Sequence, residues 1–226
     1  MSHFAILFLM GVVPVLAIGL SLLGLETLHT NPLGWLLFLT GIVYAAGTVI
    51  VAFIRRERLW ESGLSDDTVK KEPGDRSFWL ITLGMLAVFY LSPLETLYFE
   101  AFLPRTAWME TGGAGLVVLG SGLFLLARRT LGANYSGHVS VRRRQELVQS
   151  GPYQIVRHPA YTGYLLMAFG LGLGYSSLAG FASTLLVLLP AVVYRIGAED
   201  RLLAEHFGAQ FDDYARKTKR LLPGFW

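Results

Sequence analysis

The sequence contains no cysteine and little charge. Among its 226 residues 53% are hydrophobic, and only 15% are Asp, Glu, Lys or Arg, whereas soluble domains have about 25% of these charged residues. The absence of Cys excludes disulfides, thiolate metal sites and cysteine nucleophiles. The scarcity of charge argues against a disordered chain and against a soluble globular enzyme, and it favours a membrane protein.

Several familiar catalytic and binding motifs are also missing. The chain has no G-x-G-x-x-G, no P-loop, no H-E-x-x-H and no G-x-S-x-G. Dinucleotide, nucleotide-phosphate, zinc-protease and serine-hydrolase functions therefore lack their usual signatures. A net charge of +3 is compatible with nucleic-acid binding, but the basic residues border apolar segments. We therefore expect membrane lipids as partners, and neither nucleic acid nor a metal ion.

Six apolar stretches contain no Asp, Glu, Lys, Arg or His. They are Phe4–Leu25, Leu33–Ile54, Phe78–Leu94, Gly112–Ala127, Tyr161–Tyr175 and Ala179–Tyr194. About 20 apolar residues span the hydrocarbon core of a bilayer, so the sequence predicts an all-α, polytopic membrane protein with about six transmembrane helices. The last two stretches are short enough to be a tight helical hairpin, and Pro190 is expected to kink the sixth helix.

The basic residues predict the orientation. All but one of the 19 Lys and Arg lie in residues 55–77, 127–160 and 195–226, and the exception is Arg105. Six spans place these three segments on one face, which the positive-inside rule makes cytosolic. We therefore expect both termini and the active site on the cytosolic side. Residues 55–77 mix acidic and basic residues around Pro73-Gly74, which is typical of a solvated loop.

Polar residues that could perform chemistry concentrate in two places. Arg157-His158-Pro159 precedes the fifth stretch, and Pro159 suits the first turn of a helix. Arg195 and Glu199 follow the sixth stretch four residues apart, so a helix would present both on one face. Apolar residues continue this helical spacing to Tyr214 and predict an amphipathic C-terminal helix over residues 197–217. The alternative is that the arginines only snorkel to the membrane surface and that this helix only lies on it.

Two blocks of residues resemble the isoprenylcysteine carboxyl methyltransferase family, over roughly residues 115–226. The first block is Leu147-Val148-x-x-Gly151-Pro152-Tyr153-x-x-x-Arg157-His158-Pro159-x-Tyr161-x-Gly163. The second block is Glu199-Asp200, Phe207-Gly208, Tyr214 and Pro223. The resemblance implies an N-terminal part, residues 1–110, that carries helices one to three. It also implies a methyltransferase core, residues 111–226, with helices four to six, a cytosolic cofactor loop 127–160 and the C-terminal helix.

The resemblance implies S-adenosylmethionine as the cofactor, with S-adenosylhomocysteine as product. The implied cofactor-binding residues are Gln145, Leu147, Val148, Tyr153, His158, Pro159, Ala160, Tyr161 and Glu199. Arg195 is implied as a catalytic residue that orients the acceptor, and Arg157 as one that supports the pocket. Two positions depart from the family pattern, because Gln145 stands where a His is common and Asp200 where a second Glu is usual.

The implied reaction is methyl transfer to the carboxylate of a lipid-modified, isoprenylcysteine-like acceptor, either a small molecule or a lipidated protein. A carboxylate is already ionised at pH 7 and needs no general base. Related membrane enzymes methylate phospholipid amines or small thiols, and an amine would need a base, for which Glu199, Asp200 and His158 compete. A transporter or a non-catalytic scaffold is the alternative of another class. A transporter usually carries ionisable groups within its spans and internal repeats, and we find neither.

Overall fold

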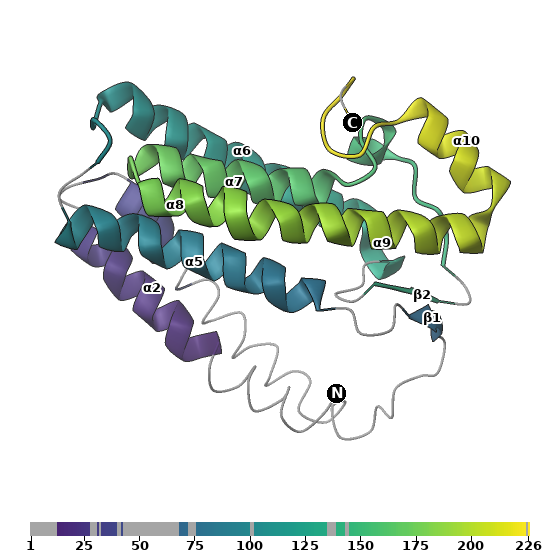
Figure 1. Cartoon of the computed structure of the whole chain (residues 1–226), viewed down its shortest axis with the longest axis horizontal. Coiled ribbons are helices and arrows are strands. Elements are labelled where there is room, and N and C mark those ends of the chain that lie inside the picture. Colours follow the sequence, from purple (N-terminus) through teal and green to yellow (C-terminus); the bar gives the residue numbers. More distant parts are fainter. Residues whose placement is uncertain are drawn as a thin grey trace.

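The computed structural model describes residues 13–27, 31, 33–39, 42, 68–71, 76–99, 102–134, 139–142, 145–224 and 226. The start of the first apolar stretch and most of the second therefore lie outside the described residues. The helices are α2 (Val13–Thr27), α5 (Ser77–Tyr98), α6 (Ala107–Leu131), α7 (Pro159–Gly174), α8 (Leu178–Ser183), α9 (Leu189–Phe207) and α10 (Ala209–Lys217). Most run along the long axis of the molecule, and α10 lies at one end (Figure 1).

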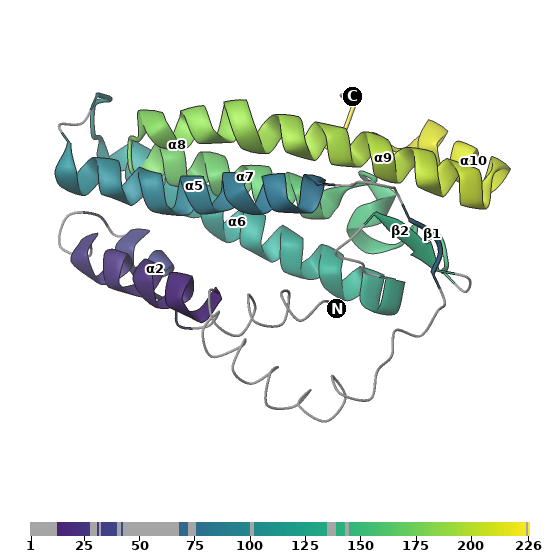
Figure 2. The same cartoon turned by 60° about the horizontal axis from the view of Figure 1, so that its bottom comes forward.

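The protein is a multi-pass integral membrane protein with an all-α architecture. Among the described residues, three helices are long and apolar enough to cross a membrane: Ser77–Tyr98, Ala107–Leu131 and Leu178–Phe207. α7 has 16 residues, and its rise of roughly 24 Å falls short of a hydrocarbon core of about 30 Å. Figure 2 shows α5, α7 and the α8–α9 rod lying side by side. Six spans and the cytosolic orientation stay predictions.

The sixth helix is longer than its apolar stretch predicted. α8, a π-helical turn at Thr184–Leu188 and α9 form one helix of 30 residues, because the charged residues after Tyr194 continue the helix of the apolar part. The π-helical turn ends two residues before Pro190, and the expected kink at this proline stays a prediction. Proline cannot donate the usual backbone hydrogen bond, and a wider turn accommodates that loss.

α6 and α7 pack closely because glycines meet along their contact. A Cβ added at Gly113 would lie 2.5 Å from the carbonyl oxygen of Gly170, and one at Gly120 would lie 2.6 Å from that of Gly163. No larger side chain fits between these two backbones. Small residues at such crossings allow membrane helices to approach closely. The start of α7, which carries the predicted site, is thus held firmly against α6.

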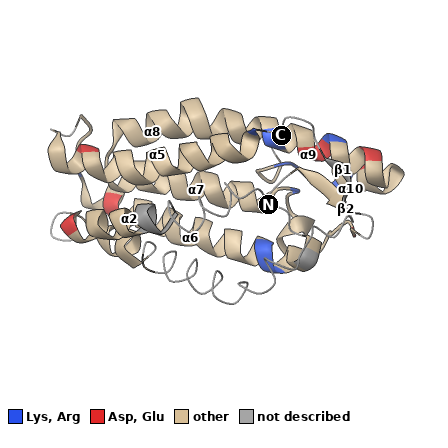
Figure 3. Cartoon of the chain, turned by 90° about the horizontal axis from the view of Figure 1, so that it is seen from below, with Lys and Arg blue, Asp and Glu red and all other residues tan. Residues whose placement is uncertain are grey.

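Two local expectations are wrong. Residues 68–71, predicted as solvated loop, form strand β1 (Thr68–Lys71), which pairs antiparallel with β2 (Ser140–Arg142). This pairing joins two of the basic segments, and most of the described Lys and Arg lie at this end of the bundle (Figure 3). The predicted C-terminal helix 197–217 is broken at Gly208, whose φ of 53° only glycine adopts readily, so α9 ends there and α10 begins.

Candidate functional site

The site is built where α7 begins beside the middle of α9. His158 precedes α7 and Pro159 is its first residue, as the missing N–H of proline predicted. The backbone amides of Arg157 and His158 donate hydrogen bonds to the carbonyls of Lys219 and Arg220 at 2.7 and 3.0 Å. The chain after α10 therefore folds back and fixes the turn that leads into α7.

Arg195 and Glu199 meet on one face of α9, which confirms the contact predicted from their spacing. The Nε of Arg195 donates to Glu199 Oε1 at 3.0 Å and to the hydroxyl of Tyr161 at 2.5 Å. Tyr161 in turn donates to the same carboxylate oxygen at 2.5 Å. A second guanidinium nitrogen of Arg195 donates to Ser77 Oγ at 3.3 Å. Arg195 is 3% exposed, so the snorkelling alternative is wrong for this residue.

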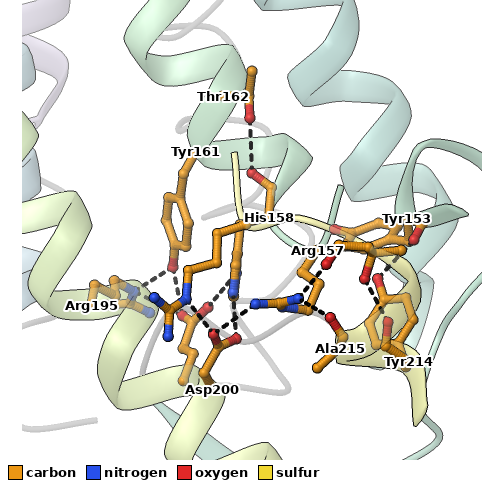
Figure 4. Close-up of polar contacts among 12 residues, drawn as sticks. Tyr153, Arg157, His158, Tyr161, Thr162, Arg195, Asp200, Tyr214 and Ala215 are labelled. Carbon is orange, nitrogen blue, oxygen red and sulfur yellow. Dashed lines mark hydrogen bonds and ion pairs between the residues drawn. The ribbon is translucent and has the colours of Figure 1, made fainter. Parts of the chain in front are cut away.

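His158 lies between two carboxylates. Its Nε2 is 2.8 Å from Asp200 Oδ1, and its Nδ1 is 3.5 Å from Glu199 Oε2. Burial alone lowers the pKa of His158, but the hydrogen bonds and charges of Asp200 and Glu199 outweigh burial, and the net pKa is raised. The raised pKa favours the protonated form of the ring, in which both N–H groups are directed at carboxylates (Figure 4).

Arg157 fastens the end of α10 to the site. One guanidinium nitrogen donates to the carbonyls of Ala215 and Thr218 at 3.0 and 2.6 Å, and the other approaches Asp200 at 3.5 Å. Ala215 lies in the last turn of α10 and Thr218 is its C-cap, and a cation is favoured at this end of a helix. Nearby, the hydroxyl of Tyr214 donates to the carbonyl of Tyr153 at 2.7 Å, and burial raises the pKa of Tyr214 to about 12.

These groups border a cavity of about 200 Å³, far larger than a single water needs. The structure brings ten of the eleven predicted site residues to its wall: Gln145, Leu147, Val148, Tyr153, Arg157, His158, Ala160, Tyr161, Arg195 and Glu199. Pro159 does not reach the wall, because it is buried as the first residue of α7. The assignment of these residues to a cofactor stays a prediction.

The cavity is lined by both polar and apolar side chains. Its wall carries the polar groups of Arg195, Glu199 and His158. It also carries membrane-helix residues that sequence reasoning missed, among them Phe78, Ile81, Phe124 and Tyr164. Phe124 and Tyr164 stack with their ring centroids 4.9 Å apart. They come from stretches that were predicted only as spans. Nothing in a uniformly apolar stretch distinguishes a residue that faces a cavity from one that faces lipid.

Sequence reasoning also missed two residues that complete the polar cluster. Arg220 donates to Asp200 Oδ2 at 2.8 Å, and Thr218 supplies a carbonyl to Arg157. Asp200 does not line the cavity, although its neighbour Glu199 does, because consecutive residues point about 100° apart around a helix. That difference in direction could have been read from the sequence and would have separated the roles of the two acidic residues.

Comparisons with known proteins find membrane methyltransferases that are similar to this chain. The sequence model of the family described as phospholipid methyltransferase matches residues 108–210. Protein-S-isoprenylcysteine O-methyltransferase B of Arabidopsis thaliana is 28% identical over 149 residues, which are 64% of this chain and 76% of that protein. Protein-S-isoprenylcysteine O-methyltransferase of Schizosaccharomyces pombe is 29% identical over 188 residues, covering 77% and 78%. The chain is thus similar to membrane methyltransferases, most of all over its C-terminal half.

Two further comparisons define how far the family likeness reaches. A solved structure of the eukaryotic intramembrane Ras methyltransferase ICMT matches with a TM-score of 0.59 at 21% identity, covering 96% of this chain and 74% of that one. At this identity the likeness concerns the fold. The cobalt-zinc-cadmium resistance protein CzcN of Cupriavidus metallidurans is 42% identical over 88 residues, but these are 38% of this chain and 39% of that protein. The family uses S-adenosylmethionine. The proteins that are similar to this chain differ in the function that their names describe.

Proposed function

We propose that the protein transfers a methyl group from S-adenosylmethionine to the carboxylate of a lipid-modified, isoprenylcysteine-like acceptor. The observation that carries the proposal is one cavity wall that combines the polar groups of Arg195 and Glu199 with apolar side chains, some of them from membrane helices. An acceptor with a carboxylate at one end and a lipid chain at the other matches both kinds of side chain. Arg195 would bind the carboxylate, because a guanidinium binds carboxylates with directed hydrogen bonds.

The residues present fit the cofactor. Leu147, Val148 and Tyr153 offer apolar and aromatic surface for a nucleoside. The Glu199 side chain, which lines the cavity and is 23% exposed, offers a partner for a cationic end. When bound, S-adenosylmethionine supplies an electrophilic methyl group on a sulfonium. Glu199 and the residues around it bind and orient, and the apolar side chains of the wall exclude water, which strengthens the electrostatic interactions inside.

The bonding of the ionisable groups favours a carboxylate acceptor over an amine. An amine must lose a proton, and three groups compete to accept it. His158 has both ring nitrogens directed at carboxylates and a raised pKa. Asp200 is held by His158 and Arg220 outside the cavity wall, and Glu199 Oε1 already accepts from Tyr161 and Arg195. A carboxylate acceptor needs none of them as a base.

An acceptor panel tests the proposal. Purified protein in detergent is supplied with methyl-labelled S-adenosylmethionine and with farnesylcysteine, its carboxamide as the matched control, phosphatidylethanolamine or a small thiol. We expect a base-labile methyl ester on farnesylcysteine and no label on the carboxamide. Label on phosphatidylethanolamine or the thiol, with none on farnesylcysteine, would overturn the choice of acceptor. If a titration finds no binding of S-adenosylhomocysteine at millimolar concentration, every methyltransferase function is contradicted. A non-catalytic scaffold would then be the remaining function.

A further inference from the structure

The chain that follows α10 is attached to the start of α7 at several points. We call Thr218–Leu221 the C-terminal segment. Its carbonyls accept from the amides of Arg157 and His158, and the carbonyl of Leu221 accepts from Thr162 Oγ1 at 2.9 Å. Residues that are about 60 positions apart in sequence are thereby joined at the turn that presents His158.

Arg220 in this segment leads to the cavity through a chain of contacts. Its Nε donates to Asp200 Oδ2 at 2.8 Å, and the other oxygen of Asp200 lies 2.8 Å from His158 Nε2. The opposite ring nitrogen, Nδ1, lies 3.5 Å from Glu199. Arg220 and Asp200 do not line the cavity, whereas His158 and Glu199 do. The order Arg220, Asp200, His158, Glu199 thus runs from the surface to the cavity wall.

Arg220 is the nearer of the two arginines that hold Asp200. Arg157 approaches the same carboxylate at 3.5 Å, and its other guanidinium nitrogen donates to the carbonyls of Ala215 and Thr218. Arg220 is itself fixed, since its guanidinium lies 5.0 Å from the centroid of the Trp226 ring and its amide donates to the Trp226 carbonyl at 2.8 Å. Removing the nearer cationic partner of a buried carboxylate leaves part of its charge uncompensated, which is unfavourable unless the remaining donors come closer.

We propose that Arg220 is a positioning residue, which through Asp200 and His158 sets the Glu199 carboxylate at the cavity wall. The inference rests on the proposed function, in which Glu199 binds the donor. It assigns to Asp200 a part that differs from Glu199: Asp200 joins α9, the turn before α7 and the C-terminal segment, and it binds no ligand. The segment therefore completes the site although it lies outside the cavity.

The first test needs no cofactor. The ionisable groups around His158 are Glu199 and Asp200 on α9, Tyr161 on α7 and the adjacent Arg157, with Arg220 behind Asp200. The His158 pKa is measured by NMR of labelled histidine in micelles, assigned with His158→Gln. Because Arg220→Gln removes a nearby cation, we expect that pKa to rise by about half a unit or more. Arg216→Gln, which alters an exposed arginine paired with Asp213, is the matched control. An unchanged or lowered pKa in Arg220→Gln overturns the proposal.

The second test follows the effect to Glu199. We expect Arg220→Gln to weaken S-adenosylhomocysteine binding about tenfold, and Arg220→Lys, which keeps the charge, to stay within about threefold of the unmodified protein. Arg220→Gln combined with Asp200→Asn should be little worse than either alone, whereas Arg216→Gln with Asp200→Asn should be additive. Additivity of Arg220→Gln and Asp200→Asn overturns the proposal. If Arg220→Gln does not fold, the same comparison is made with Arg220→Lys. If the unmodified protein binds no S-adenosylhomocysteine, the proposed function fails, while the NMR test still decides whether Arg220 positions His158.

Discussion

Two carboxylates, the buried Glu95 and the partly buried Glu199, stand at opposite ends of the bundle and are held in different ways. Glu95 on α5 accepts from Ser177 Oγ at 2.7 Å and from the amides of Leu178 and Ala179 at 3.2 and 2.8 Å. Its partners are neutral groups at the start of α8, where the helix dipole favours an anion. Glu199 is held instead by side chains, two of them cationic, and it borders the cavity.

The difference separates a structural carboxylate from one that can serve a ligand. Backbone amides keep their direction while α8 is folded, so the hydrogen bonds that they donate to Glu95 are fixed. The partners of Glu199 are side chains, and a cationic ligand in the cavity could share its oxygens with them. We therefore expect substitutions around Glu199 to change binding and turnover, and substitution of Glu95 to change stability.

The largest effect is expected at the cationic partner of Glu199. Arg195→Lys keeps the charge and loses the planar fork that contacts Glu199, Tyr161 and Ser77. If Arg195 orients the acceptor carboxylate, turnover of farnesylcysteine should fall about 100-fold or more, with S-adenosylhomocysteine affinity nearly unchanged. Arg201→Lys, on an exposed position of α9, is the control. Turnover near that of the unmodified protein would rule out the orienting role.

Glu199→Gln should act on the cofactor. The substitution keeps the size of the side chain and removes the charge that is proposed to pair with the donor. A hydrogen bond to a charged group is worth about 1.5–3 kcal/mol, so S-adenosylhomocysteine affinity should fall roughly ten- to a hundredfold. Titration calorimetry measures it, with Glu205→Gln on an exposed position of the same helix as control. Equal affinity in folded Glu199→Gln protein would contradict the assignment.

Glu95→Gln should show the opposite result. The amide nitrogen of Gln would face donors at the start of α8, and at least one of the three hydrogen bonds to Glu95 would be lost. We expect the free energy of unfolding in detergent to fall by about 1–3 kcal/mol, with S-adenosylhomocysteine affinity unchanged in the folded fraction. Glu110→Gln, in the first turn of α6, is the comparison. A loss of affinity without a loss of stability would erase the distinction between the two carboxylates.

The smallest expected effect is a pH dependence of the stability that His158, the neighbour of Glu199, contributes. The pKa of His158 is raised above 6.5 in the folded state, so protonated His158 contributes stability that is fully present below pH 6.5. This contribution is lost as the pH rises through the folded pKa. Unfolding of the unmodified protein and of His158→Gln, measured between pH 5 and 9, should give a difference that shrinks toward the alkaline side. A difference that grows with pH would mean that His158 is buried in its neutral form.

The sequence predicted contacts between residues that are close along one helix and missed those that depend on how distant segments meet. Arg195 and Glu199 are four residues apart, so helical geometry alone predicted their contact. Arg157 and Asp200 are 43 residues apart, and the pairing of β1 with β2 joins segments further apart. No local pattern encodes these contacts. The break at Gly208 escaped notice because Phe207, Phe211 and Tyr214 keep a helical spacing across it.

The π-helical turn at Thr184–Leu188 determines which way the polar part of α9 points. A π turn accommodates one residue more than an α turn, and each residue of an α-helix rotates the side chains that follow by about 100°. The turn lies against α5, where a Cβ at Gly84 would be 3.0 Å from Leu188 Cα. The turn therefore changes the directions in which side chains point about the helix axis, between the part of the helix before it and the part after it. The membrane half meets α5 in one angular register, and the half beyond it turns Arg195 and Glu199 toward Tyr161 instead of toward lipid.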